Sequence, residues 1–500
     1  MILAIFLLPI AGALLAGAAA RVSAPLSRWL SLLVLCAGLV LTLVVWSGHQ
    51  ATLWAPGASW MLELDRPWLP LLGVHFHLAM DGLSLLLILL TYFLGIVSVL
   101  ISWREIRERV GFFHLCLLFV LAGVVAVFLA ADLFLFYFVW ELMLVPMYFL
   151  IAIWGHENRR YAAIKFFIFT QASGLLMLVA ILALTFLHYR LTGVYTFQYN
   201  ELVGTRTGSP TGSWIMLGFL AAFAVKLPAV PVHTWLPDAH TEAPTAGSVL
   251  LAGLLLKTGA YGMLRFVLPI FPEGTAKLAT LMMVLAVIGI LYGAFMAFAQ
   301  TDIKRLVAYT SVSHMGFVLL GIFARNEFAL RGAVVQMLAH GLSTGALFVV
   351  AGIVQARLHT RELGGMGGLW TTAPLLGGLT LAFVMSSVGL PGLGDFVGEF
   401  LILLGAYQRS IGFAVVATLG MIAALVYGLK VVQDAFHGPN LRRLRMRDVL
   451  PHEGAVLLVM LAGLICIGLY PRRLLHALDP SVPSLPPATV MSDTGARAAR

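Results

Sequence analysis

Long apolar runs separated by short polar loops fill most of this chain. There are fourteen such runs, at residues 2–20, 29–48, 82–102, 112–130, 132–154, 163–187, 213–235, 246–268, 276–299, 304–323, 331–356, 373–407, 411–435 and 453–470. Because a helix needs about 20 apolar residues to cross a bilayer, each run predicts a membrane-spanning segment. The expected fold is an all-α polytopic membrane protein with about 14 transmembrane helices.

Two of these runs contain residues that break helices. The seventh holds Pro228 and Pro231, in "VKLPAVPVHTWLP", and the twelfth holds "GLPGLGDFVGE" at 389–399. A proline inside a helix removes a backbone hydrogen bond, and in lipid the freed groups must be satisfied by protein or water. We therefore predict that helices 7 and 12 are discontinuous and that their breaks create polar pockets at mid-depth.

The positions of the two breaks predict an internal repeat. The breaks lie five runs apart, and runs 4–8 and 9–13 each end with a helix that bears a lysine, Lys257 and Lys430. A unit of five spans must be inverted when it is repeated in tandem, as in transporters built from two inverted halves. The expected domains are helices 1–3 with an extracytoplasmic loop (1–111), a first five-helix repeat (112–268), a second, inverted repeat (276–435), and a last helix with an extracytoplasmic tail (436–500).

The composition agrees with a membrane protein and argues against several other classes. Charged residues make up 11% of the chain, against roughly 25% in soluble domains. Cys36, Cys116 and Cys466 lie inside apolar runs without metal-ligand spacing, and no Gly-rich phosphate loop is present. We expect no metal and no cofactor bound by this chain. We also expect no nucleic-acid partner, because the net charge of +9 comes from the loops.

The distribution of lysine and arginine predicts the orientation in the membrane. Loops after odd-numbered spans hold 16 basic residues, among them Lys165 and Lys304, and loops after even-numbered spans hold 8, among them Arg265. The positive-inside rule then places the odd-span loops in the cytoplasm and both termini outside it. The first run lacks a charged leader, which favours an uncleaved span over a signal peptide. A bacterial plasma (inner) membrane is the expected location.

Ionisable residues lie within the apolar runs, where each costs about 2.5–3.5 kcal/mol on insertion scales. The six most central are Glu141, Lys226, Lys257, His314, His340 and Glu399. Burial disfavours a charged lysine and a nearby carboxylate favours it, so such a lysine can exchange a proton when its partner changes. We interpret the six residues as a proton-transfer chain, because a sodium site would require several carboxylate and carbonyl oxygens instead.

Simpler interpretations of these residues stay open. Glu141 and Lys226 could form a static ion pair that locks two helices. His314 and His340 could be hydrogen-bonded core histidines, although the serines beside them favour a hydrated path.

Charged residues near the ends of spans have simpler explanations. Lys430 and Asp434 are four residues apart near an interface, which favours a local salt bridge. Asp81 and Asp302 precede spans and are expected to cap them, and Asp132 at a span end requires no function.

Three segments of the chain resemble a known family. "VKLPAVPVHTWLPDAHTEAPTAGSVLLAGLLLKTGAYG" (225–262), "TDIKRLVAYTSVSHMG" (301–316) and "FYFVWELMLVPMYFLIAIWG" (136–155) are similar to the antiporter-like subunits of respiratory complex I, NADH:quinone oxidoreductase. The resemblance covers residues 80–470 approximately. The family also includes subunits of Mrp-type cation/proton antiporters and of membrane-bound hydrogenases.

The resemblance implies roles for individual residues and a fold of fourteen helices with two inverted five-helix repeats. It implies that Glu141 pairs with Lys226, that Lys257 lies centrally, and that a residue of the broken twelfth helix completes the route. That last position is Glu399 here, as in the M-type subunits (chain 4), whereas most family members have lysine. The long lateral helix of the L-type subunits is missing.

The function implied by the resemblance is proton translocation in the membrane arm of complex I, driven by redox chemistry in partner subunits. It implies that partner subunits bind NADH, FMN, iron–sulfur clusters and quinone, and that the neighbours are the antiporter-like L and N subunits and lipids. The alternatives are an Mrp-type antiporter subunit, against which Glu399 argues, a hydrogenase pumping subunit, and a structural scaffold with inert charge pairs.

Overall fold

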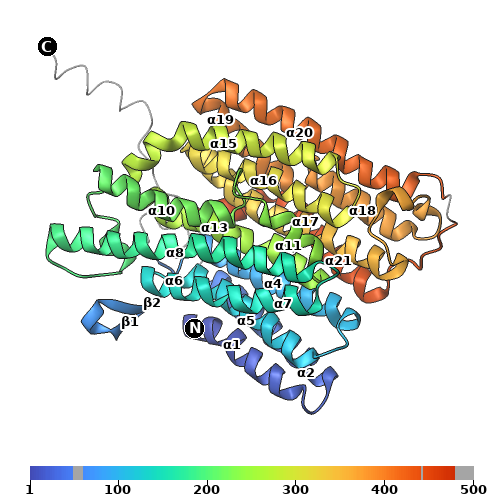
Figure 1. Ribbon diagram of the computed structural model, residues 1–500, viewed down its shortest axis with the longest axis horizontal. Coiled ribbons are helices and arrows are strands. Elements are labelled where there is room, and N and C mark those ends of the chain that lie inside the picture. The colour runs from blue at the N-terminus through green and yellow to red at the C-terminus, as the bar shows by residue number, and fades with distance from the viewer. Residues whose placement is uncertain (49–59, 441–442, 479–500) are drawn as a thin grey trace.

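The computed structural model describes residues 1–48, 60–440 and 443–478. Most of these residues are helical, and the long helices lie approximately side by side (Figure 1). The predicted extracytoplasmic tail after residue 479 lies outside the described residues.

Within the described ranges, twelve helical segments are long and apolar enough to cross a membrane. They are α1 (Ile2–Ala19), α2 (Ala24–Gly48), α4 (Gly82–Glu105), α5 (Val110–Leu129), α6 (Leu133–Leu142) with α7 (Leu144–Trp154), α8 (Arg159–Thr192), the segment Thr245–Ile270, which contains α12 (Thr245–Leu250), α13 (Leu256–Gly262) and α14 (Leu268–Ile270), α15 (Pro272–Phe298), α16 (Ile303–Ala324), α17 (Glu327–Leu358), α20 (Ile411–Val432) with η6 (Gln433–His437), and α21 (Pro451–Leu469). The chain is thus a multi-pass membrane protein, as the apolar runs predict.

The two remaining predicted runs are each divided into shorter helices. The seventh consists of α10 (Pro210–Lys226) and α11 (Trp235–Glu242), and the twelfth consists of α18 (Pro374–Ser387) and α19 (Gly394–Arg409). The all-α membrane fold is therefore confirmed. The inverted relation of the two halves, and the domain boundaries based on it, stay predictions.

Three central segments hold buried lysines, histidines and hydroxyl-bearing residues. The most apolar windows of α16, α17 and the segment Thr245–Ile270 are fully buried within the protein, whereas those of α1, α2, α20 and α21 are about one-third buried. In Figure 1, α13, α16 and α17 lie in the middle, with α1 and α2 at one side and α20 at the other. Polar side chains on the central helices are thus shielded from lipid by protein.

Aspartate side chains start several of these helices. Asp81 accepts a hydrogen bond from Ser84 N, and Asp302 accepts from Lys304 N and Arg305 N. These bonds satisfy backbone donors that have no partner within the helix. Both predicted caps are confirmed, and Asp132 caps α6 in the same way.

The break in the seventh span is held by side-chain and backbone contacts. Trp235 Nε1 donates a hydrogen bond to Val225 O at 2.9 Å across the break. Helix α13 packs closely against the end of α10, since a Cβ at Gly259 would lie 2.7 Å from both Leu227 N and Phe223 O. Only a glycine permits this approach, which brings the lysine-bearing helix α13 up to the break.

The break in the twelfth span depends on glycine backbone conformations. Gly389 and Gly392 have φ values of +80° and +94°, which side chains other than glycine rarely adopt. The chain therefore turns between Ser387 and Gly394 and starts α19 at mid-protein.

One local structure was not predicted. The described part of the loop between α2 and α4 forms an antiparallel hairpin of β1 (Leu62–Leu69) and β2 (Val74–Met80), which extends from one end of the helices (Figure 1). In β2 the inner half is buried against the helices.

Lys430 differs from the expectation of a local salt bridge. Its Nζ donates to the carbonyls of Phe298 at 2.7 Å and Gln300 at 3.3 Å, at the end of α15, rather than to Asp434. Because helix ends have carbonyls without intrahelical partners, they attract this cation more directly than a side chain on its own helix does.

Replacement of Trp235 tests the break of the seventh span. Trp235→Phe keeps an aromatic ring but removes the indole donor, leaving the buried Val225 carbonyl without this hydrogen bond. We expect a loss of about 1–2 kcal/mol of stability, seen as a lower melting temperature of the purified protein. Trp214→Phe, at a position 75% exposed, is the matched control and should leave the melting temperature unchanged. Equal melting temperatures for both variants would contradict the role of the hydrogen bond.

Candidate functional site

A buried lysine–histidine contact lies at the centre of the molecule. Lys257 in α13 and His340 in α17 are both 0% exposed, and Lys257 Nζ lies 2.7 Å from His340 Nδ1. The lysine also donates to Ala252 O, in the π-helical segment Leu251–Leu255 before α13. His340 Nε2 has no protein hydrogen-bond partner among the described residues. The contact requires Nδ1 to be the acceptor when Lys257 is charged.

The cluster continues from His340 to His314 and Glu399. The rings of His340 and His314, on α16, have centroids 5.5 Å apart. His314 Nδ1 lies 3.0 Å from Glu399 Oε1 on α19, and its Nε2 lies 3.0 Å from Ser387 Oγ at the end of α18. Four of the six predicted site residues are thus brought together from four different segments.

The other two predicted residues, Glu141 and Lys226, lie close together but are not in ion-pair contact. Lys226 is 2% exposed, and its Nζ lies 5.1 Å from the centre of the Trp140 ring, a cation–π contact. Glu141 lies against Gly174 of α8, where a Cβ would collide with Glu141 Oε1. Each charge acts on the other across the gap. The structure therefore shows a separated pair, in contrast to the static ion pair that the sequence left open.

A second line of polar groups extends from the cluster along α11 and α16. His240 of α11 is fully buried, stacks on Phe348 with ring centroids 4.7 Å apart, and feels the charges of both Lys257 and Lys304. Lys304 Nζ donates to Ala243 O at 3.1 Å and lies 3.3 Å from His156 Nε2. These residues lead from the centre toward one end of the molecule, and both ring nitrogens of His240 have no hydrogen-bond partner among the described residues.

That end contains a cavity of about 510 Å³, which we call the vestibule. Its lining includes Arg104, Glu105, Arg107, His156, Thr245, Gln355, Arg357, His359, His452 and Glu453. Glu105 is exposed and accepts hydrogen bonds from the Thr245 backbone and hydroxyl. Titratable side chains thus line the vestibule from its open side to the His156–Lys304 contact.

The charge state of His156 is set by its surroundings. Burial, followed by the positive charges of Lys304, Arg361 and Arg159, lowers the pKa of His156 from 6.5 to about 3. His156 is therefore neutral near pH 7. A neutral imidazole can accept a proton on one nitrogen and release one from the other.

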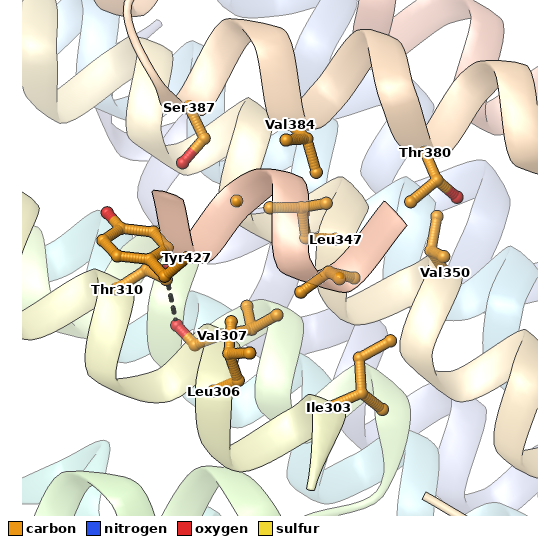
Figure 2. Close-up of a pocket in the computed structure, with 12 residues that line it drawn as sticks. Ile303, Leu306, Val307, Thr310, Leu347, Val350, Thr380, Val384, Ser387 and Tyr427 are labelled. Atoms are coloured by element: carbon orange, nitrogen blue, oxygen red, sulfur yellow. Dashed lines mark hydrogen bonds between the residues drawn. The ribbon is translucent and has the colours of Figure 1, made fainter. Parts of the chain in front are cut away.

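A much smaller cavity, of about 20 Å³, adjoins the cluster between α16, α17, α18 and α20. In Figure 2, Ser387 and Tyr427 lie at one end of it and Thr380 and Ile303 toward the other. Most of the remaining lining is valine and leucine. The side of His314 that faces Ser387 is therefore narrow and largely apolar beyond the two hydroxyls.

Three basic residues assigned to loops from the sequence are placed differently by the structure. Lys304 is fully buried in α16, and Lys165 lies in α8, where it contacts Asp238 at 2.6 Å. Arg265 is buried and pairs with Asp81 at 2.5 Å. Hydropathy locates the end of a run but not the depth of a side chain, so these residues could not be separated from true loop residues.

Sequence reasoning also missed Asp395, in the first turn of α19. This side chain is 0% exposed and accepts hydrogen bonds from Ser343 Oγ at 3.0 Å and Ser386 Oγ at 2.6 Å. The sequence feature that could have identified Asp395 is its position four residues before Glu399, within the predicted break. His240, Lys304 and His156 were likewise missed, because they lie at run ends.

Metal binding finds no support in the described part of the chain. No group of three or more His, Cys, Asp or Glu side chains there could hold a metal ion.

The chain was compared with known proteins. A family model described as "NADH:quinone oxidoreductase/Mrp antiporter, TM" matches residues 130–425. NADH-quinone oxidoreductase subunit M of Pseudomonas aeruginosa is 53% identical over 481 residues, 94% of each chain, and the subunit M of Escherichia coli is 49% identical over 504 residues, 99% of each. A chain of respiratory complex I from Thermus thermophilus with bound NADH superposes with a TM-score of 0.85 at 33% identity, covering 96% of this chain and 98% of that one.

The low pKa of His156 predicts a pH dependence of stability. Below pH 6.5 the unfolded chain protonates this histidine, whereas the folded protein does so only near pH 3. The contribution of neutral His156 to the free energy of unfolding is therefore fully present above pH 6.5 and is lost as the pH falls toward 3. In His156→Gln the loss of stability between pH 7 and about pH 5 should be smaller by about 1 kcal/mol.

Thermal unfolding of the parent and the variant across this pH range measures the effect. The comparison near pH 8 controls for damage unrelated to titration. Parallel curves for the two proteins down to pH 5 would rule out the low pKa.

Proposed function

Because the chain belongs to the NADH:quinone oxidoreductase/Mrp antiporter transmembrane family, we propose that it translocates protons in the membrane arm of an NADH:quinone oxidoreductase. The family membership confirms the resemblance seen in the sequence. The observation that carries the proposal is the buried series Lys257, His340, His314 and Glu399, in which three adjacent contacts span four segments. Titratable groups in this position are costly to bury, which favours a function for them.

Protons are taken up from the vestibule. A proton reaching His156 at Nδ1 is released from Nε2 to a neutral Lys304, 3.3 Å away. The charges of Lys304 and Lys257 both act on His240. His240 serves as the next acceptor of the proton after Lys304. Both lysines are fully buried, so each can exist as ammonium or amine depending on nearby charge.

The central cluster carries the proton onward to the broken twelfth helix. Lys257 Nζ donates to His340 Nδ1 over 2.7 Å, and His340 then releases a proton from Nε2 toward His314. His314 passes it from Nδ1 to Glu399 Oε1 over 3.0 Å. Glu399 discharges it along α19, toward the extracytoplasmic side expected from the positive-inside orientation.

The separated Glu141–Lys226 pair serves as the control element. When the pair closes, the carboxylate stabilises charged Lys226, and when it opens, buried Lys226 favours its neutral form. Because α10 contacts α13 closely at Gly259, movement at the break reaches the helix that carries Lys257. Redox chemistry elsewhere in the complex would drive this opening and closing.

The assembly implied by this function contains the redox cofactors in other chains. We propose that partner subunits bind NADH, FMN, iron–sulfur clusters and quinone, and that antiporter-like L-type and N-type subunits and lipids flank this chain. The proposed location is the bacterial inner membrane, with both termini on the extracytoplasmic side. Subunits named NADH-quinone oxidoreductase subunit M among the relatives support this assignment.

An Mrp-type cation/proton antiporter subunit is the second candidate, because the family description covers both kinds of protein. A cation site would need several oxygen ligands, whereas the centre of this site contains Lys257 and two histidines. Proton translocation that depends on NADH oxidation but not on sodium distinguishes the two functions.

Lys226→Ala tests the control element. The variant should still assemble, but NADH-driven proton translocation in membrane vesicles should fall by roughly tenfold or more, since a proton-transfer group is lost. Lys430→Ala, which removes a half-buried lysine near the end of α20 that bonds to backbone carbonyls, is the matched control. A normal ratio of protons to NADH in assembled Lys226→Ala would exclude the role of Lys226.

Lys257→Arg tests whether the central lysine must lose its proton. Arginine keeps the positive charge but does not deprotonate in proteins, so translocation should fall about as strongly as with Lys257→Ala. The readout is vesicle acidification per NADH oxidised in the assembled complex. If the arginine variant translocates protons like the parent, Lys257 acts only as a fixed charge.

A further inference from the structure

The buried carboxyl of Asp395 has no role in the route described above. It lies in the first turn of α19, one helical turn before Glu399, so both carboxyls are on one face of the same helix. Asp395 is 0% exposed and Glu399 is 2% exposed. Capping does not account for the side chain, because its recorded acceptor contacts are with hydroxyls of other helices and not with backbone donors of α19.

Hydroxyl groups connect Asp395 to both histidines of the cluster. Ser343, which donates to Asp395 Oδ1 at 3.0 Å, lies one turn after His340 on α17. Ser386, which donates to Oδ2 at 2.6 Å, directly precedes the Ser387 that contacts His314. The carboxyl is thus adjacent to the cluster through two hydroxyls that can each accept and release a proton.

The titratable groups that face Asp395 come from four segments. Its charge interacts with those of Lys257 in α13, His314 in α16, Glu399 in α19 and Tyr427 in α20. With neutral histidines, one ammonium and two ionised carboxylates would leave a net negative charge buried in the protein. An uncompensated buried charge is strongly unfavourable, so one proton held between the two carboxyls would balance the site.

We propose that Asp395 is a second proton-carrying carboxyl of this site, and that it shares one proton with Glu399. When Glu399 is ionised beside His314, Asp395 is protonated, and when Glu399 receives a proton from His314, Asp395 releases its own through Ser386 or Ser343 to the extracytoplasmic exit of the proposed route. One proton enters the pair and one leaves it in each transfer, so the charge of the pair is conserved. This inference rests on the proposed function.

Such a pair titrates as a unit rather than as two independent groups. Because the pair keeps one proton in total, Glu399 can gain or lose a proton without adding a buried charge at any step. The broken twelfth helix would therefore supply two carboxyls instead of one, from positions 395 and 399 of the same helical face.

Asp395→Asn tests the proposal in the assembled complex in membrane vesicles. Asparagine keeps the size and can bond to both serines, but it cannot carry the proton. We expect the complex to assemble, and the pH profile of NADH-driven proton translocation to shift by about one pH unit, the usual effect of one neighbouring charge. Infrared difference spectra between the oxidised and reduced complex should lose one protonated-carboxyl band.

Asp395→Glu, which can still carry the proton, should restore the profile and the band. Asp434→Asn is the matched control, because it makes the same chemical change at the end of the thirteenth span and should leave both readouts unchanged. A parental pH profile and an intact carboxyl band in Asp395→Asn would overturn the proposal.

The double variant Ser343→Ala with Ser386→Ala gives an independent test if the asparagine variant fails to assemble. It leaves the carboxyl in place and removes both hydroxyl connections, so the pH profile should again shift, and an unchanged profile would overturn the proposal. Failure of the proposed function looks different, because the parent complex itself would then oxidise NADH without acidifying the vesicles.

Discussion

The structure depends on keeping the amino group of a lysine inside the apolar centre of a membrane protein. Lys257 achieves this without a carboxylate in direct contact, since its Nζ lies against His340 Nδ1 and the Ala252 carbonyl. An ion in this position is costly to bury, and three fully buried segments surround it. The neighbouring π-helical segments change the helical register on either side of the lysine and present a carbonyl toward it.

The two broken spans bring the polar chemistry to mid-depth. In the seventh, the break ends α10 at Lys226 and is bridged by the Trp235 indole. In the twelfth, glycines with positive φ allow α18 to end with two serines and α19 to carry Asp395 in its first turn. Hydroxyls and carboxyls thus replace backbone hydrogen bonds where the helix is interrupted, as lipid requires.

The polar groups form a line with a wet end and a closed side. At one end, the vestibule brings charged side chains to His156 and Lys304. Near His314, the small cavity beside Ser387 is lined mainly by aliphatic side chains (Figure 2). This asymmetry matters for proton movement, because a route open to water on every side would allow protons to leak through the membrane.

The sequence by itself determined the membrane class, the positions of the spans, both breaks and the six central ionisable residues, because hydropathy and proline are properties of single segments. Only the tertiary structure decided that Glu141 and Lys226 are separated, that Lys304 is buried rather than in a loop, and that Asp395 faces the cluster. Depth and contact between helices depend on how segments distant in the chain pack. No local pattern encodes which hydroxyl, carbonyl or ring will face a buried charge.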